Sequence, residues 1–213
     1  MYNRKDLLGL RDLSADEIMT ILNTAKEMKA KIDNPSLRDD SLSKSSIVTL
    51  FYENSTRTKM SFMLAGDYQG AIVKDLGVAT SSVSKGESLV DTGVTLDQMG
   101  INIMIIRHQM TGAAHLLAKN VKASVVNAGD GSNEHPTQAL LDLFTIMEKK
   151  GSFEGLKVVI LGDISHSRVA RSNAFGLTKL GAKVTLAGPS TLVSNSMKSL
   201  GVEVETDIPK AIK

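Results

Sequence analysis

The sequence predicts an α/β protein made of two doubly wound parallel-sheet domains, the second of them incomplete. Three observations lead to this fold class. Short runs rich in β-branched residues alternate with longer segments of helical periodicity. Such alternation is typical of a parallel sheet with helices on both faces. The pattern restarts after the charged, glycine-containing segment 149–155. We therefore expect one domain over residues 1–150 and a second over 151–213.

The first domain opens with an amphipathic helix and then follows the alternation of strands and helices. Ser14 followed by Glu17 is a capping box, and apolar residues at helical spacing continue to Met28. The run 46–51 has the length and β-branched content of a buried strand, and a helix should follow it. Further strands are expected at 71–75, 102–106 and 123–127, and further helices at 87–99, 112–119 and 136–149.

The second domain contains fewer elements. A strand starts at Leu156, and the pattern then predicts a helix at 167–180, a strand at 183–187, a helix at 191–200 and a short strand at 202–205. Roughly 60 residues make a thin core for a doubly wound sheet, because small domains bury a lower fraction of their surface. We therefore expect this domain to be incomplete.

Composition limits the classes of function. With 42% hydrophobic and 23% charged residues, the chain should be soluble and globular. It has no apolar run that could cross a bilayer and no secretory signal at its start, which favours the cytoplasm over a membrane. The absence of cysteine excludes disulfides, thiolate zinc sites and a cysteine nucleophile. A net charge of +2 and 4% aromatic residues without Trp disfavour nucleic acid, so the expected ligand is a small anion.

The turn after the strand at 46–51 carries the clearest anion-binding signal. Three hydroxyl residues and an arginine stand where a helix should begin: Ser55, Thr56, Arg57 and Thr58. Free backbone N–H groups and the helix dipole favour a phosphate there, hydroxyls donate to its oxygens, and a guanidinium binds it through two hydrogen bonds. For a single hydroxyl the alternative is a plain helix N-cap.

This Ser-Thr-Arg-Thr turn, followed by an aromatic-containing helix, resembles the carbamoyl-phosphate motif of the aspartate and ornithine carbamoyltransferases. The resemblance implies that all four residues hold the phosphate and that Thr58 also reaches the carbamoyl group. Arg57 and Thr58, together with His135, would then be the catalytic residues.

The segment His135-Pro136-Thr137-Gln138 opens the longest helix of the first domain. A histidine N–H can polarise a carbonyl, and a glutamine can bind an amide NH₂. The alternative is a capping His135 and a solvated Gln138. The segment is similar to a second family signature, in which His135 and Gln138 bind the carbamoyl end. Its third residue, Thr137, resembles the aspartate enzymes, since the ornithine enzymes usually carry Cys there.

The polar stretch 79–88 is expected to be a loop. In the aspartate enzymes a serine and a lysine of this loop enter the neighbouring subunit's active site, and the matching positions are Ser81 and Lys85. The resemblance therefore implies a homotrimer with shared active sites, with Lys85 contacting both carbamoyl phosphate and aspartate. The alternative for Lys85 is a solvated surface lysine.

Arg107 follows the strand at 102–106 directly, at the carboxyl end where α/β proteins bind ligands. The resemblance implies another carbamoyl-phosphate ligand, and the alternative is a structural ion pair. His108 and His115 lack metal-site spacing, so we interpret both as structural.

The stretch 162–173 also places polar residues between a strand and a helix, but it lacks the glycines of a dinucleotide motif or a P-loop. In the family the arginine at the position of Arg168 binds a carboxylate of aspartate. Arg171 is expected to be supporting. The residues that complete the aspartate site in relatives would lie beyond Lys213.

The resemblance thus implies transfer of the carbamoyl group from carbamoyl phosphate to L-aspartate, giving N-carbamoyl-L-aspartate and phosphate in pyrimidine biosynthesis. It implies no metal or organic cofactor, and it leaves regulatory or other pathway subunits open. We expect this chain to bind carbamoyl phosphate with weak or no activity on its own. The alternatives are a non-catalytic carbamoyl-phosphate-binding or interaction protein and an ornithine carbamoyltransferase.

Overall fold

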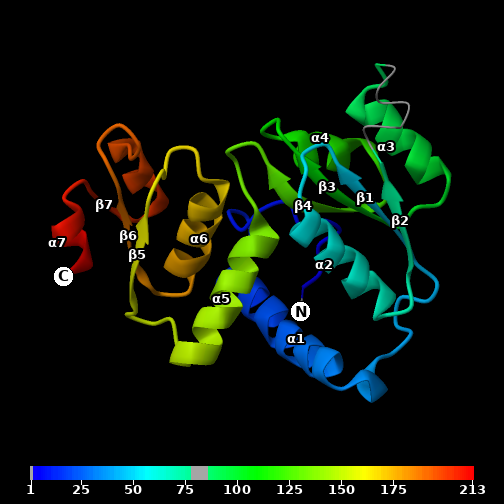
Figure 1. Cartoon of the computed structure of the whole chain (residues 1–213), viewed down its shortest axis with the longest axis horizontal. Helices are drawn as coiled ribbons and strands as arrows, with labels where there is room; N and C mark the ends of the chain where they lie inside the picture. The colour runs from blue at the N-terminus through cyan, green and yellow to red at the C-terminus, as the bar shows by residue number, and fades with distance from the viewer. Residues whose placement is uncertain (1, 78–85) are drawn as a thin grey trace. The chain divides into compact units, whose positions relative to one another are not determined.

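The structure, a computed structural model, describes residues 2–77 and 86–213, which form two compact units. The first-sheet unit comprises Asn3–Leu8 and Thr24–Gly131, and the second-sheet unit comprises Gly9–Asn23 and Ser132–Lys213 (Figure 1). Helix α5 thus groups with the second sheet. The domain limits 1–150 and 151–213 follow the sequence pattern and stay a prediction.

A parallel sheet of four strands, in the order β2-β1-β3-β4, is the centre of the first-sheet unit. Its strands are β1 Ser46–Phe51, β2 Ile72–Leu76, β3 Ile103–His108 and β4 Ser124–Asp130. Its helices are α2 Thr56–Asp67, α3 Leu89–Gln98 and α4 Ala113–Asn120, with a 3₁₀ turn at Pro35–Leu37. The predicted alternation is confirmed here, with ends that differ by a few residues at most.

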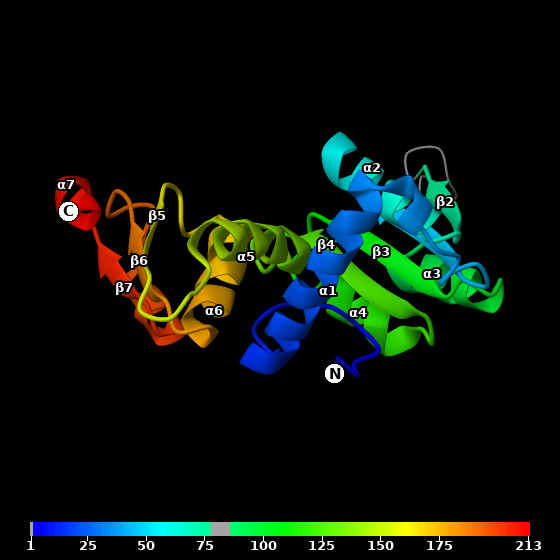
Figure 2. The ribbon, with the colours of Figure 1, turned by 90° about the horizontal axis from the view of Figure 1, so that it is seen from below.

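Helices cover both faces of this sheet, because alternate residues of a strand point to opposite sides (Figures 1 and 2). On one face Leu50 is buried in a cluster with Leu117 of α4, and on the other Ile47 is buried in a cluster that includes Phe62 of α2. Burial on both faces explains why β1 is a nearly continuous apolar run.

An arm at the start of the chain, residues 3–8, adds to the outer edge of β4. Leu7 and Val126 form a parallel bridge. The Leu7 N–H donates to the carbonyl of Val125 at 2.9 Å, and the Asn127 N–H donates to the carbonyl of Leu7 at 2.9 Å. This arm was not predicted from the sequence.

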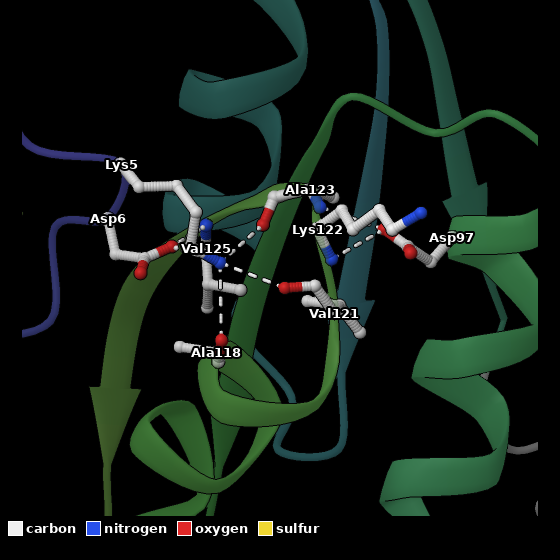
Figure 3. A network of polar contacts seen from close by, with 8 residues as sticks. All are labelled: Lys5, Asp6, Asp97, Ala118, Val121, Lys122, Ala123 and Val125. Atoms are coloured by element: carbon white, nitrogen blue, oxygen red, sulfur yellow. Dashed lines mark hydrogen bonds and ion pairs between the residues drawn. The ribbon is translucent and has the colours of Figure 1, made fainter.

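Lys5 fixes the arm to the end of helix α4. Its Nζ donates to the carbonyls of Ala118, Val121 and Ala123 at 3.2, 3.0 and 3.1 Å (Figure 3). The last carbonyls of a helix have no partner within the helix, and a cation there also faces the negative end of the helix dipole. Beside it, the Oδ1 atom of Asp6 accepts the Val125 N–H at 2.8 Å.

The second-sheet unit contains a parallel sheet of three strands, in the order β5-β6-β7. The strands are β5 Lys157–Leu161, β6 Lys183–Ala187 and β7 Glu203–Glu205. The helices are α5 Pro136–Lys150, α6 Arg168–Lys179 and α7 Ile208–Ile212, with a 3₁₀ helix at Asn195–Leu200. The fold class, α/β with parallel sheets and a small second sheet, is confirmed.

The predicted helix at 191–200 is wrong, because this segment holds only the 3₁₀ helix. The Ser194 Oγ accepts the Ser196 N–H at 3.2 Å just before it. Serine and asparagine side chains compete in this way with the helical hydrogen bonds of the backbone. Helix α7 was not predicted.

Helix α1 spans Ala15–Asp33 and begins with the predicted capping box. The Ser14 N–H donates to Oε2 of Glu17 at 2.7 Å, and the Glu17 N–H donates to Oγ of Ser14 at 3.1 Å. Ile18 and Leu22 on its apolar face are fully buried. Across the described ranges, none of the helices has the length and apolarity needed to cross a bilayer.

Candidate functional site

The turn between β1 and α2 is open to an anion. Ser55 occupies the N-cap position with an extended backbone, φ −159° and ψ 95°, yet its side chain makes no capping hydrogen bond. The first N–H groups of a helix have no acceptor within the helix. Thr56 and Arg57 are exposed and Thr58 is half-buried. The turn therefore presents main-chain donors, hydroxyls and a guanidinium at the positive end of a helix dipole.

A polar cluster behind this turn holds α2 against the sheet. The buried Thr49 donates from Oγ1 to Oδ1 of Asp75 at 2.6 Å, and Lys59 binds Oδ2 of Asp75 at 2.9 Å. Partial burial alone would raise the pKa of Asp75, but the hydrogen bonds from Thr49 and Lys59 outweigh it and hold that pKa below its ordinary value. Lys59 is thereby fixed in the first turn of α2.

Arg107 lies at the carboxyl end of β3, in register with Phe51 of β1. Its Nη2 forms an ion pair with Oε1 of Glu53 at 2.6 Å, and its Nη1 donates to the carbonyl of Ala128 at 3.4 Å. The side chain is 13% exposed. Its Nε is buried, and within the described residues it has no partner. Glu53 stands just before the turn, so this ion pair brings the Arg107 guanidinium to the candidate anion site.

His108, interpreted as structural from the sequence, makes its contacts within the first-sheet unit. It is buried, its Nδ1 accepts the Met110 N–H at 2.9 Å, and its ring centroid lies 4.7 Å from that of Tyr52. Burial lowers the pKa of His108 and outweighs the opposing charges of Asp130 and Glu53, which favours the neutral ring.

His135 occupies the N-cap position of α5 in the second-sheet unit, and Pro136 is the first helical residue, as predicted. The residue is 5% exposed, and its side chain makes no capping hydrogen bond. The His135 N–H instead donates to Oγ of Ser172 on α6 at 2.9 Å. The His135 backbone is thus fixed by α6, while its side chain does not cap the helix.

Glu134, which sequence reasoning missed, continues this network. It is 3% exposed and accepts hydrogen bonds from the Leu10 N–H at 2.7 Å and from the Ser172 hydroxyl at 3.0 Å. Burial raises the pKa of Glu134 despite these donors. A side chain at position 9 would displace this carboxylate, because a Cβ there would lie 2.2 Å from Oε1 of Glu134. Nothing in the local sequence distinguishes this glutamate from a surface one.

A second polar contact joins α5 to α6. Nε2 of Gln138 donates to Oδ1 of Asp142 at 3.0 Å, and Nδ2 of Asn173 donates to Oδ2 of the same carboxylate at 2.7 Å. Gln138 is half-buried and Asn173 is buried. The predicted site residue Gln138 is therefore held by Asp142, which Asn173 binds in turn, and the sequence singled out neither of these two.

Arg168 is the first residue of α6 and is half-buried. The preceding Ser167 caps the helix, because its Oγ accepts the Ala170 N–H at 3.1 Å. Arg171 is also half-buried, and its Nε has no partner in the part of the chain that the structure describes.

The predicted site residues fall into two groups. The first-sheet unit holds Ser55, Thr56, Arg57, Thr58 and Arg107, and the second-sheet unit holds His135, Gln138 and Arg168. Ser81 and Lys85 lie outside the described residues. Across residues 2–77 and 86–213, no group of three or more His, Asp or Glu side chains could hold a metal ion.

A groove of about 700 Å³ lies elsewhere, along the three strands of the second sheet. None of the predicted site residues that the structure describes lines it. Its wall carries more lysines than glutamates, and Lys210 forms an ion pair with Glu205 at 2.5 Å. We assign it no ligand.

These features define an α/β protein with a candidate anion site at a helix N-terminus. Residues 5–148 match the family model described as aspartate/ornithine carbamoyltransferase, carbamoyl-P binding domain. The chain belongs to the aspartate/ornithine carbamoyltransferase family, and its relatives place it with the aspartate carbamoyltransferase catalytic subunits.

Two relatives of that name illustrate the similarity. The catalytic subunit of Acetivibrio thermocellus is 61% identical over 98% of this chain and 67% of its own length. That of Ruminiclostridium cellulolyticum is 60% identical over 98% of this chain and 66% of its own length. The structure of Trypanosoma cruzi aspartate transcarbamoylase in complex with carbamoyl phosphate superimposes with a TM-score of 0.85 at 30% identity, over 94% of this chain and 65% of that one. The chain spans about two thirds of the length of these relatives.

Proposed function

We propose that this chain binds carbamoyl phosphate and serves the transfer of its carbamoyl group to the amino group of L-aspartate. The products are N-carbamoyl-L-aspartate and phosphate, a step of pyrimidine biosynthesis. The observation that carries the proposal is the β1–α2 turn, where Ser55 leaves its hydroxyl uncommitted to capping and the Arg107 guanidinium is held nearby by Glu53.

At the phosphate end, the first turn of α2 supplies N–H groups and hydroxyls from Ser55, Thr56 and Thr58. The guanidinium groups of Arg57 and Arg107 neutralise the charge, which increases on the leaving phosphate as the reaction proceeds. When the ligand binds, Arg107 either contacts Glu53 and the phosphate together or exchanges its ion pair with Glu53 for one with the phosphate.

At the carbamoyl end, the His135 side chain polarises the carbonyl and the Gln138 amide binds the NH₂ group. The aspartate amine attacks the carbonyl carbon, the bond from that carbon to the phosphate oxygen breaks, and phosphate leaves with the electron pair. The amine loses a proton, for which the departing phosphate is the acceptor that the substrate itself supplies. Positioning and electrostatic stabilisation account for most of the acceleration.

The aspartate side of the site includes Arg168, whose guanidinium pairs with a carboxylate of the substrate. We further propose that Ser81 and Lys85 enter the site of a neighbouring subunit in a cytoplasmic homotrimer. The name catalytic subunit, which the relatives carry, supports an assembly that includes regulatory or other subunits.

Titration calorimetry with carbamoyl phosphate tests the proposal directly. The wild-type chain should bind it saturably, and Arg57→Ala should lose most of that affinity. Lys44→Ala is the charge-matched control, because Lys44 is exposed and precedes the amino end of β1, opposite the turn. It should bind like the wild type. Equal affinities of all three proteins would contradict a site at this turn.

Aspartate added to the saturated protein then tests the transfer itself. Formation of N-carbamoyl-L-aspartate identifies an active chain. Binding without product identifies the alternative, a protein that binds carbamoyl phosphate and does not turn it over.

A further inference from the structure

Asp142 holds two side-chain amides at once. It lies one turn after Gln138 on α5 and accepts Nε2 of Gln138 at 3.0 Å on one oxygen. Its other oxygen accepts Nδ2 of Asn173 at 2.7 Å. Asn173 belongs to helix α6, which lies beside α5 (Figure 1). Neither Asp142 nor Asn173 was assigned a role from the sequence.

An ionised carboxylate accepts hydrogen bonds and donates none. Each amide that faces Asp142 must therefore turn its NH₂ group toward the carboxylate and its carbonyl oxygen away. The reversed orientation would bring two lone-pair-bearing oxygens together, which is repulsive. The charge of Asp142 thus decides an orientation that an amide alone would leave open.

Asn173 shows how strongly this preference acts. The residue is 8% exposed, and its Oδ1 is buried without a hydrogen-bond partner in the described ranges. An unpaired buried acceptor is unfavourable, yet the side chain keeps its NH₂ group on Asp142. The same carboxylate therefore fixes the Gln138 amide with Oε1 on the side away from Asp142.

This orientation has a chemical consequence at a carbamoyl group. Carbamoyl phosphate carries an NH₂ group, a donor, where acetyl phosphate carries a methyl group. We infer that Asp142 is a positioning residue, which presents Oε1 of Gln138 as an acceptor and so makes the site select a carbamoyl over an acetyl group. The inference rests on the proposed function, because it needs Gln138 to contact the carbamoyl group.

A purely structural role for Asp142 would have a different effect. If the carboxylate only joined α5 to α6, its loss would weaken the binding of both acyl phosphates by the same factor. If it orients Gln138, its loss changes the ratio of the two affinities, because an amide that can turn over no longer offers a fixed acceptor.

The test is titration calorimetry of the full chain with carbamoyl phosphate and with acetyl phosphate. Wild type should bind carbamoyl phosphate about tenfold more tightly than acetyl phosphate, as expected for one hydrogen bond. Asp142→Asn keeps the shape but can offer either an oxygen or an NH₂ group to Gln138, and it should bind the two ligands within about twofold of one another. Asn173→Ala removes the other amide from Asp142 and should keep the wild-type ratio.

A measurement without ligand tests the orientation itself. In ¹H–¹⁵N spectra, the side-chain NH₂ signals of both Gln138 and Asn173 should shift when Asp142 is replaced by Asn, because both amides lose the same charged acceptor. In Asn173→Ala the Gln138 signals should stay at their wild-type positions. Gln138 signals that are unchanged in Asp142→Asn would overturn the inference.

The outcomes separate the two proposals. A wild-type preference that survives unchanged in Asp142→Asn overturns the role of Asp142 and leaves the proposed function intact. If the wild type binds no carbamoyl phosphate while both amide signals still shift in Asp142→Asn, the proposed function fails and the orientation by Asp142 stands.

Discussion

Replacement of Glu134 tests the network that fixes the start of α5. In Glu134→Ala the Leu10 N–H and the Ser172 hydroxyl lose their acceptor, while both donors stay inside the unit. Each orphaned buried donor costs about 1–3 kcal/mol. The variant also removes the unfavourable burial of a carboxylate, which offsets part of this cost. We therefore expect a net loss of about 3 kcal/mol of stability. Glu134→Gln keeps one oxygen as an acceptor and should lose about 1 kcal/mol.

Urea unfolding at neutral pH, followed by circular dichroism, measures these differences. Glu27→Ala is the control, because Glu27 is exposed on α1 and surface substitutions usually change stability by less than about 0.5 kcal/mol. A Glu134→Ala protein as stable as this control would refute the reasoning, since it would mean that water satisfies both donors in the variant.

The pH dependence gives a second test of the same residue. Burial raises the pKa of Glu134, so the folded protein binds this proton more tightly than the unfolded chain does. The stability from this group is complete below the ordinary glutamate pKa and is lost as the pH rises through the folded pKa. The stability of Glu134→Gln should not show this fall with rising pH. Identical pH profiles of stability for wild type and Glu134→Gln would contradict the raised pKa.

Three further substitutions test other parts of the first-sheet unit. Lys5→Met removes three hydrogen bonds to carbonyls at and after the end of α4, and urea unfolding should show a loss of about 1–2 kcal/mol. Lys122→Met, at an exposed position, should show none. Glu53→Gln removes a negative charge and the ion pair on Arg107, so calorimetry at low salt should find inorganic phosphate bound about threefold to tenfold more tightly. An unchanged affinity would argue against Arg107 as an anion ligand. Asp75 has a lowered pKa, so its stabilising effect is present at neutral pH and is lost as the pH falls through the folded pKa. The stability difference between wild type and Asp75→Asn should therefore vanish in acid, and a difference that stays constant would contradict the lowered pKa.

Elements that depend on neighbours in sequence were predictable. The capping box of Ser14 and Glu17 and the strand 46–51 lie where the pattern placed them, because hydrogen bonding and burial act there on adjacent residues. The candidate anion-binding turn was proposed on the same basis, since its hydroxyls and Arg57 are contiguous, and its role stays a prediction. The helix at 191–200 failed because periodicity was weighed without the competing hydrogen bonds of Ser194.

Contacts between distant residues could not be predicted from one sequence. Glu134 and Ser172 lie 38 positions apart, and Asp142 and Asn173 lie 31 positions apart. No local period links such pairs, and each residue alone would be compatible with a solvated surface. The residues that position the candidate site are therefore less visible in the sequence than those expected to contact the substrate. Ser81 and Lys85 stay predictions.

The arm on β4 has a consequence for synthesis of the protein on the ribosome. Leu7 leaves the exit tunnel early, but its partner Val126 follows 119 residues later. At about 5–20 residues per second, the arm stays unpaired for roughly 6–24 s. During that time its apolar residues are accessible to chaperones and to neighbouring nascent chains. The first-sheet unit can cover the outer edge of β4 only after most of its sequence has emerged. The residues of the arm therefore form their backbone pairing later than most of the unit.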